Sequence, residues 1–109
     1  MKISILLPLK ENFSPSYAGA VSLFINDTLQ YSKFKKKITV FGQTEFKKKF
    51  DKKYFNINIK KSFFQSQNKD YVKQFIKKEK ELDSDIIELH NRPIYLKYLV
   101  NDLNNRNYI

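Results

Sequence analysis

The sequence contains no cysteine and no tryptophan, and it has one histidine, two glycines and three prolines. The absence of cysteine excludes disulfides, thiolate metal sites and a thiol nucleophile. A single histidine excludes a metal centre built only from imidazoles. No apolar run approaches the roughly 20 residues of a membrane-spanning helix, and the first residues lack the small-residue cleavage site of a signal peptide. We therefore expect no metal, no cofactor and a cytoplasmic location.

What the chain does contain is apolar and aromatic. Hydrophobic residues make up 41% of the sequence and aromatic residues 16%, which is typical of a globular protein rather than of a disordered one. Its 109 residues are enough for one core and too few for two domains. We therefore expect a single domain over residues 1–109.

The net charge of +10 is concentrated in one central block of the chain. Residues 33–61 hold eleven lysines against two acids, whereas residues 1–32 are neutral and residues 62–109 carry +1. Such a block can bind phosphates or anionic lipids, and it can equally be a solvated surface. Lysine lacks the two-pronged guanidinium of arginine, and the chain shows no nucleic-acid-binding motif. We therefore expect no specific nucleic-acid partner.

Apolar residues alternate between strand-like and helix-like spacing along the chain. The pattern predicts strands near residues 3–9, 37–42, 54–59 and 85–90, and helices near 18–32, 69–82 and 93–104. The last two residues indicate the start of a further strand. Strands separated by helices favour parallel pairing with right-handed crossovers. The sequence therefore predicts an α/β fold with a Rossmann-like, doubly wound parallel sheet.

Ligands of such a sheet bind beyond the carboxyl ends of its strands. The predicted loops bring His90, Arg92 and Glu11 to that edge, together with the backbone amides near Gly19. His90 is the only histidine, and Arg92 offers a fork of donors to an anion, so we expect both to belong to a ligand site. Glu88 shares a strand face with His90. We nevertheless expect Glu88 to pair with a lysine near the strand end.

Gly19 precedes the first predicted helix. Free amides and the positive end of the helix dipole allow phosphate binding at such a position. The chain has neither a G-x-G-x-x-G nor a Walker A pattern, so this signal is weak by itself. The alternative is that Gly19 simply allows the preceding loop to pack closely against the helix.

Three segments together resemble the N-terminal half-domain of GT-B glycosyltransferases of the retaining family 4. The first is the strand Ile3–Pro8 with the small-residue turn and helix start at residues 17–22, and the second is Ile38–Gly42. The third and most specific is Asp85–Pro93, because all nine positions match a strand of enzymes that act on cell-surface polysaccharide or lipopolysaccharide. The resemblance spans essentially the whole chain.

This resemblance implies transfer of a sugar from a nucleotide-sugar donor to a glycan or lipid-linked acceptor. It is compatible with peripheral binding of the protein to the inner face of an anionic membrane. By position it assigns the donor-phosphate loop to Ala18, Gly19 and Ala20. It assigns the acceptor side to His90, Asn91 and Arg92, and leaves the catalytic residues unassigned. Glu11 joins this acceptor-side cleft because the predicted sheet places it at the same edge. Ala20 departs from the family, which commonly has a second glycine there.

The nucleotide-binding C-terminal domain of that family is not among these 109 residues. We therefore expect residues 1–109 to be the first part of a longer polypeptide that cannot complete the reaction alone. A second hypothesis stays open: a small basic α/β protein that binds nucleic acid or an anionic membrane surface through Lys33–Lys61. Continuation of the reading frame into a second Rossmann domain would separate the two hypotheses.

Overall fold

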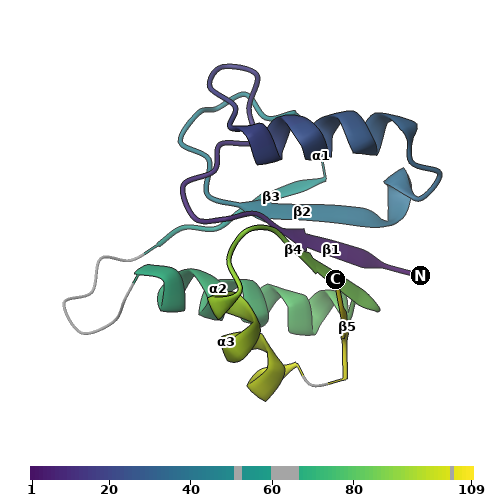
Figure 1. Cartoon of the computed structure of the whole chain (residues 1–109), viewed down its shortest axis with the longest axis vertical. Coiled ribbons are helices and arrows are strands. Elements are labelled where there is room, and N and C mark those ends of the chain that lie inside the picture. Colours follow the sequence, from purple (N-terminus) through teal and green to yellow (C-terminus); the bar gives the residue numbers. More distant parts are fainter. Residues whose placement is uncertain (51–52, 60–66, 104) are drawn as a thin grey trace.

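The computed structural model describes residues 1–50, 53–59, 67–103 and 105–109, which form one parallel sheet between two helical layers (Figure 1). The described strands are β1 (Ile3–Leu6), β2 (Ile38–Gly42), β3 (Tyr54–Asn56), β4 (Ile86–Leu89) and β5 (Asn107–Tyr108). The described helices are α1 (Ala20–Tyr31), α2 (Gln67–Leu82) and α3 (Ile94–Asp102), with a short 3-10 helix, η1, at Lys35–Lys37. The strand order is β3-β2-β1-β4-β5, and every neighbouring pair is parallel, so the predicted α/β, Rossmann-like sheet is confirmed.

The two helical layers create a topological switch point between β1 and β4. Figure 1 shows α1 on one face of the sheet and α2 and α3 on the other. The chain therefore leaves β1 toward one face and leaves β4 toward the opposite face, although these strands are neighbours. In doubly wound folds, ligands bind beyond the carboxyl ends of the two strands at such a topological switch point.

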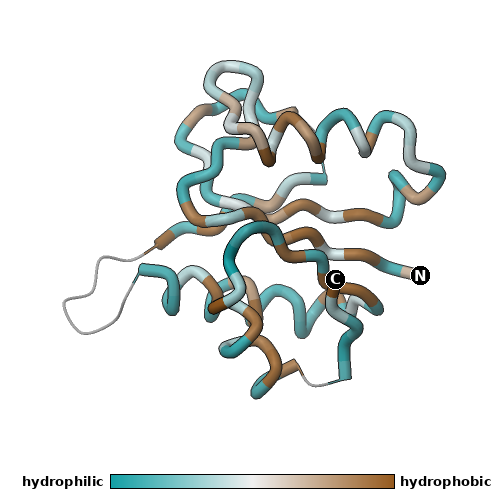
Figure 2. Tube along the Cα trace, viewed as in Figure 1, coloured by the Kyte–Doolittle hydropathy of each residue, from teal (hydrophilic) through white to brown (hydrophobic). Residues whose placement is uncertain are grey.

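Alternation along the strands divides the apolar core in two. Ile5 packs with Ile25 and Leu29 of α1, whereas Leu6 packs with Phe75 and Leu99 of α2 and α3. Successive side chains of a strand point to opposite faces, which explains the division. Figure 2 shows the apolar strands enclosed between the layers. Burial of both faces accounts for the nearly continuous apolar sequence of β1.

Several predicted boundaries are corrected by the structure. β1 ends at Leu6, close to Pro8, which has no N–H for the ladder. β3 ends at Asn56 rather than at residue 59, although the next amide still donates to Gly42 O at 2.7 Å. Helix α1 begins at Ala20 rather than at residue 18, and α3 ends at Asp102 rather than at residue 104. The further strand indicated by the last residues is β5, which confirms that prediction.

A buried ionic cluster at the amino edge of the sheet was not predicted. The Glu79 carboxylate is fully buried and accepts hydrogen bonds from Ser4 Oγ at 2.7 Å and from Ser84 N at 2.8 Å. Arg106 Nε lies 3.6 Å from Glu79, and Arg106 also contacts Asp83 at 2.8 Å. The cluster therefore joins α2 to β1, to the start of β4 and to the approach of β5.

Candidate functional site

An acidic residue and the only histidine form a pair where β4 ends. Glu88 Oε2 lies 2.7 Å from His90 Nε2, and their side chains are 29% and 19% exposed. The Phe24 ring of α1 stands edge-on to the imidazole at a centroid distance of 6.4 Å. The expected Glu88–lysine pair is therefore wrong. Residues two apart on a strand share a face, which brings the imidazole within reach of the carboxylate.

The Glu88–His90 pair orients the imidazole of His90 for hydrogen bonding or proton transfer. The Glu88 carboxylate engages one ring nitrogen and so fixes the plane of the ring. The other nitrogen, Nδ1, has no hydrogen-bond partner within the described part of the chain. A half-buried imidazole with one nitrogen held and one free can donate or accept a single directed hydrogen bond, or transfer a proton.

Glu11 lies at the start of α1 rather than in an open acceptor site. Its Oε1 accepts a hydrogen bond from Ser22 N at 2.9 Å, so it satisfies an amide of the first helical turn. A Cβ atom at position 19 would collide with the Glu11 carboxylate. Glycine at this position therefore makes room for the carboxylate, as the packing alternative required.

The donor-phosphate loop predicted at Ala18, Gly19 and Ala20 does lie at the amino end of α1. The anion now bound there is the chain's own Glu11 carboxylate. A donor phosphate would have to displace that carboxylate or share the remaining amides with it. The assignment of this loop to a donor stays a prediction.

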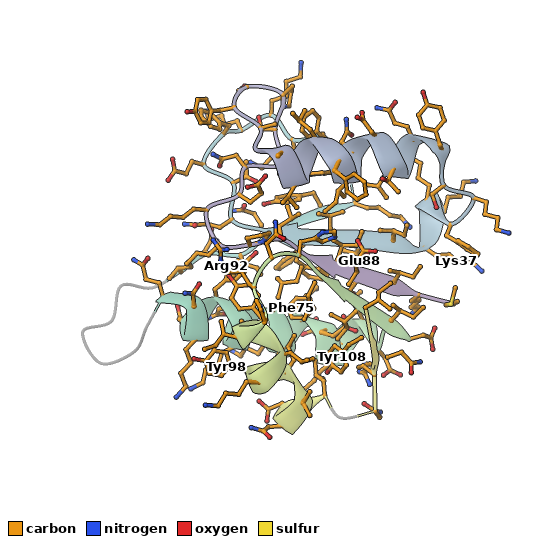
Figure 3. All side chains as sticks on the ribbon, viewed as in Figure 1. Lys37, Phe75, Glu88, Arg92, Tyr98 and Tyr108 are labelled. Atoms are coloured by element: carbon orange, nitrogen blue, oxygen red, sulfur yellow. The ribbon has the colours of Figure 1, made fainter. Side chains whose placement is uncertain are left out.

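Arg92 and Asn91 face away from the Glu88–His90 pair. They line a pocket of about 330 Å³ with Leu89, Leu96 and Tyr108. Figure 3 labels Arg92 and Tyr108 of this pocket and Glu88 of the pair. The turn is made at Asn91, whose φ of 56° lies in the left-handed region that asparagine tolerates. The predicted acceptor residues are therefore divided between two sides of the switch point.

A hydroxyl and amide cluster supports the neighbouring loops. The Tyr54 hydroxyl contacts Thr44 Oγ1 at 2.6 Å and donates to Asn56 Oδ1 at 3.0 Å. Thr44 Oγ1 in turn accepts from Phe13 N at 3.0 Å, which ties the loop after β1 to the loop after β2. Burial raises the pKa of Tyr54 to about 12, so its hydroxyl is neutral at physiological pH and serves as a structural contact.

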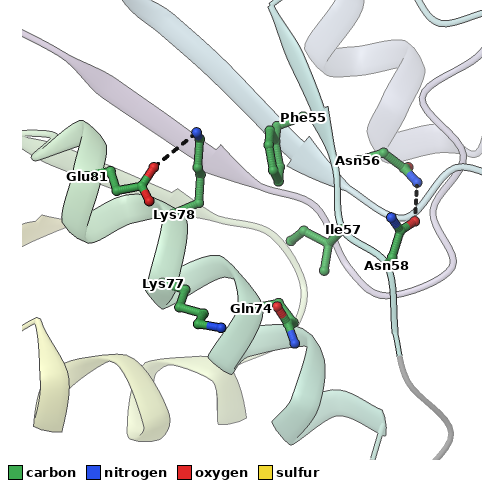
Figure 4. Close-up of a pocket in the computed structure, with 8 residues that line it drawn as sticks. All are labelled: Phe55, Asn56, Ile57, Asn58, Gln74, Lys77, Lys78 and Glu81. Carbon is green, nitrogen blue, oxygen red and sulfur yellow. Dashed lines mark hydrogen bonds and ion pairs between the residues drawn. The ribbon is translucent and has the colours of Figure 1, made fainter.

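Another hollow lies between β3 and α2, away from the switch point. It has a volume of about 420 Å³, and its lining includes Phe55, Asn56, Lys77, Lys78 and Glu81 (Figure 4). Lys78 pairs with Glu81 at 3.1 Å and lies over the Phe55 ring at 5.2 Å. The Lys78 ammonium group therefore already has a carboxylate and an aromatic ring as partners. The switch point, with its half-held imidazole, is the better candidate site.

Residues 1–50, 53–59, 67–103 and 105–109 contain no group of three or more His, Cys, Asp or Glu side chains that could hold a metal ion. None of their helices combines the length and the apolar character needed to cross a membrane. Comparison of the chain with models of protein families, with curated proteins and with solved structures finds no match.

Proposed function

We propose that this chain is the N-terminal, acceptor-side part of a GT-B glycosyltransferase similar to those of family 4. The reaction would transfer a sugar from a nucleotide-sugar donor to a cell-surface polysaccharide or lipopolysaccharide acceptor. The proposal rests on the resemblance of residues 85–93 to the corresponding strand of those enzymes. The doubly wound topology is compatible with it, but that topology serves many other functions as well.

The structural observation that best supports the proposal is the Glu88–His90 pair at the carboxyl end of β4. That end adjoins β1 at the switch point, where ligands of doubly wound sheets bind. The free Nδ1 of His90 is suited to a hydrogen bond with a sugar hydroxyl. Glu88 would be a positioning residue, because it acts through the imidazole.

The remaining residues take supporting parts in the proposal. Arg92, with its permanent charge, would hold a phosphate or carboxylate of the acceptor beside Asn91. Gly19 and its neighbours would approach the donor phosphates once Glu11 moves. The partners are then a nucleotide sugar and a glycan or lipid-linked acceptor at the cytoplasmic face of a membrane.

The test uses the longest polypeptide that the reading frame encodes. Membranes that contain lipid-linked acceptors are incubated with labelled nucleotide sugars, and the transfer of sugar is measured for the wild type and for His90→Ala. We expect His90→Ala to lower the transfer rate at least about tenfold, or roughly 1.4 kcal/mol of transition-state stabilisation. Failure of the wild type to bind or to use any nucleotide sugar would contradict the proposal.

The second candidate function is binding of nucleic acid or an anionic membrane through the basic block. The observation in its favour is the exposure of lysines along the described part of that block, at Lys33, Lys35, Lys36, Lys37, Lys47, Lys48 and Lys53. Lys52, Lys60 and Lys61 lie outside the described residues. Lysine contacts with phosphates give weak binding that salt removes. Nucleic-acid binding that survives about 0.3 M salt would therefore favour this function over sugar transfer.

A further inference from the structure

A groove lined by lysines lies at the amino edge of the sheet, opposite the candidate site. It has a volume of about 400 Å³, and Lys2, Lys36, Lys37 and Lys53 line it beside the apolar wall of Leu82. These lysines come from three separate segments: the start of β1, η1 and the turn before β3. The groove lies at the end of the sheet where doubly wound folds do not bind their usual ligands.

The register of the strands brings these lysines together. Ile3 pairs with Ile38, so Lys2 and Lys37 directly precede neighbouring paired positions. One strand further, Val40 pairs with Tyr54, which places Lys53 beside Thr39. Neighbouring strands lie about 4.8 Å apart, so the lysines stand at close spacing. The cluster is therefore set by the fold and is not an accident of flexible side chains.

The positive charges of Lys36 and Lys37 are unbalanced, because neither lysine has an acidic partner among the described residues. Lys2 Nζ donates to the carbonyl of Leu82 at 3.2 Å, and the Asp85 carboxylate, which accepts from the backbone amide of Lys2 at 2.8 Å, offsets charge near Lys2 only. Like charges on adjacent strands destabilise a sheet. A bound anion would remove that repulsion.

We propose that this groove binds a phosphate group that carries at least two negative charges, such as a phosphomonoester or a diphosphate. Ammonium groups act as point charges with three donors each, so several of them suit an anion with several charged oxygens. The volume of about 400 Å³ accommodates such a group with water. The groove lies at the opposite edge from His90 and does not depend on sugar transfer.

The phosphate can belong to a soluble compound or to an acidic phospholipid, and two arms of one experiment distinguish these sources. Inorganic pyrophosphate is titrated in the first arm, and its binding is followed by calorimetry. In the second arm, the protein is sedimented with vesicles of phosphatidylcholine, with and without phosphatidic acid. Binding in the first arm alone assigns a soluble ligand, and additional sedimentation that needs phosphatidic acid assigns the lipid.

Two double variants, each of which removes two positive charges, separate the effect of the groove from that of net charge. Lys36→Ala with Lys37→Ala removes two lysines of the groove, and Lys47→Ala with Lys48→Ala removes two exposed lysines of the loop after β2. We expect the groove variant to bind pyrophosphate at least about tenfold more weakly and the loop variant to stay within about twofold of wild type. Because all four side chains are exposed, both variants should keep the thermal stability of the wild type.

Three results would overturn the proposal. Equal losses in the two variants would mean that only net charge matters. Absence of binding to pyrophosphate and to both kinds of vesicle would mean that the groove is a solvated surface. Tighter binding of a single-stranded oligonucleotide that depends on Lys36 and Lys37 in about 0.3 M salt would assign the groove to nucleic acid instead.

Discussion

Two glutamates at opposite edges of the same sheet have opposite surroundings. At the amino edge, Glu79 is fully buried and receives hydrogen bonds from two serine residues, with Arg106 nearby. At the carboxyl edge, Glu88 is 29% exposed and has the imidazole of His90 as its partner. A buried carboxylate that accepts hydrogen bonds from several elements holds these elements together, whereas a partly exposed carboxylate paired with an imidazole can take part in binding or proton transfer. We therefore expect Glu79 to serve stability and Glu88 to serve binding or proton transfer.

The largest effect on stability is expected at Glu79. Glu79→Ala should lower the free energy of unfolding by about 3–5 kcal/mol, because it leaves the buried Ser4 and Ser84 donors without their acceptor and leaves Arg106 with the exposed Asp83 as its acidic partner. Urea unfolding followed by circular dichroism measures the change. Glu79→Gln, which retains an acceptor, should lose less. A loss below about 1 kcal/mol for Glu79→Ala would show that the cluster is not a structural anchor.

A smaller effect on stability is expected at the start of α1. This segment lies at the carboxyl edge, where the Glu11 carboxylate binds an amide of the first helical turn. Gly19→Ala should cost about 1–3 kcal/mol, because the new methyl group collides with the Glu11 carboxylate. Glu11→Ala removes the obstacle together with the contact to Ser22 N. Thermal unfolding of the two single variants and the double variant forms a cycle. The double variant should lose less stability than the sum of the single losses, and strict additivity would contradict the contact.

The strands, the helices and the parallel sheet were predictable, because they follow from spacing within short segments. The site was only partly predictable. Glu79 already stood on the apolar face of the predicted helix at residues 69–82, which could have indicated a buried partner. Its partner Ser4 could not be inferred, because the register that joins β1 to α2 is set by the folded sheet. The same holds for Glu11, which reaches Gly19 through an irregular loop.

The separation of Arg92 from His90 escaped prediction for a local reason. If the strand had continued, residues 90 and 92 would have lain on the same face, because side chains two residues apart on a strand point the same way. Instead, Asn91 adopts a left-handed backbone with φ 56°, and Arg92 emerges beside α3. Asparagine tolerates this conformation but does not require it. The residue type alone therefore left the direction of Arg92 open.

A still smaller effect on the free energy of unfolding is expected from the buried hydroxyl of Tyr54 at alkaline pH. Tyr54 has a raised pKa of about 12, caused by burial, whereas an unfolded tyrosine ionises near 10. The unfolded state therefore loses its proton first, so this contribution is fully present below pH 10 and is lost between about pH 10 and pH 12. Tyr54→Phe should lose about 1 kcal/mol at neutral pH and show a shallower alkaline decline. Unfolding curves measured across this range test it, and an unchanged slope would contradict the burial of Tyr54.

The most direct measurement compares His90→Ala with Glu79→Gln in the longest polypeptide that the reading frame encodes, recording both sugar transfer and the free energy of unfolding. His90 is partly exposed and contacts Glu88 and the edge of Phe24, so its loss should change stability by less than about 0.5 kcal/mol. Its transfer rate should fall at least about tenfold. Glu79→Gln should lose stability while its folded fraction transfers sugar at the normal rate. A destabilised His90→Ala that retains the normal rate would contradict the account, because His90 would then be a packing residue.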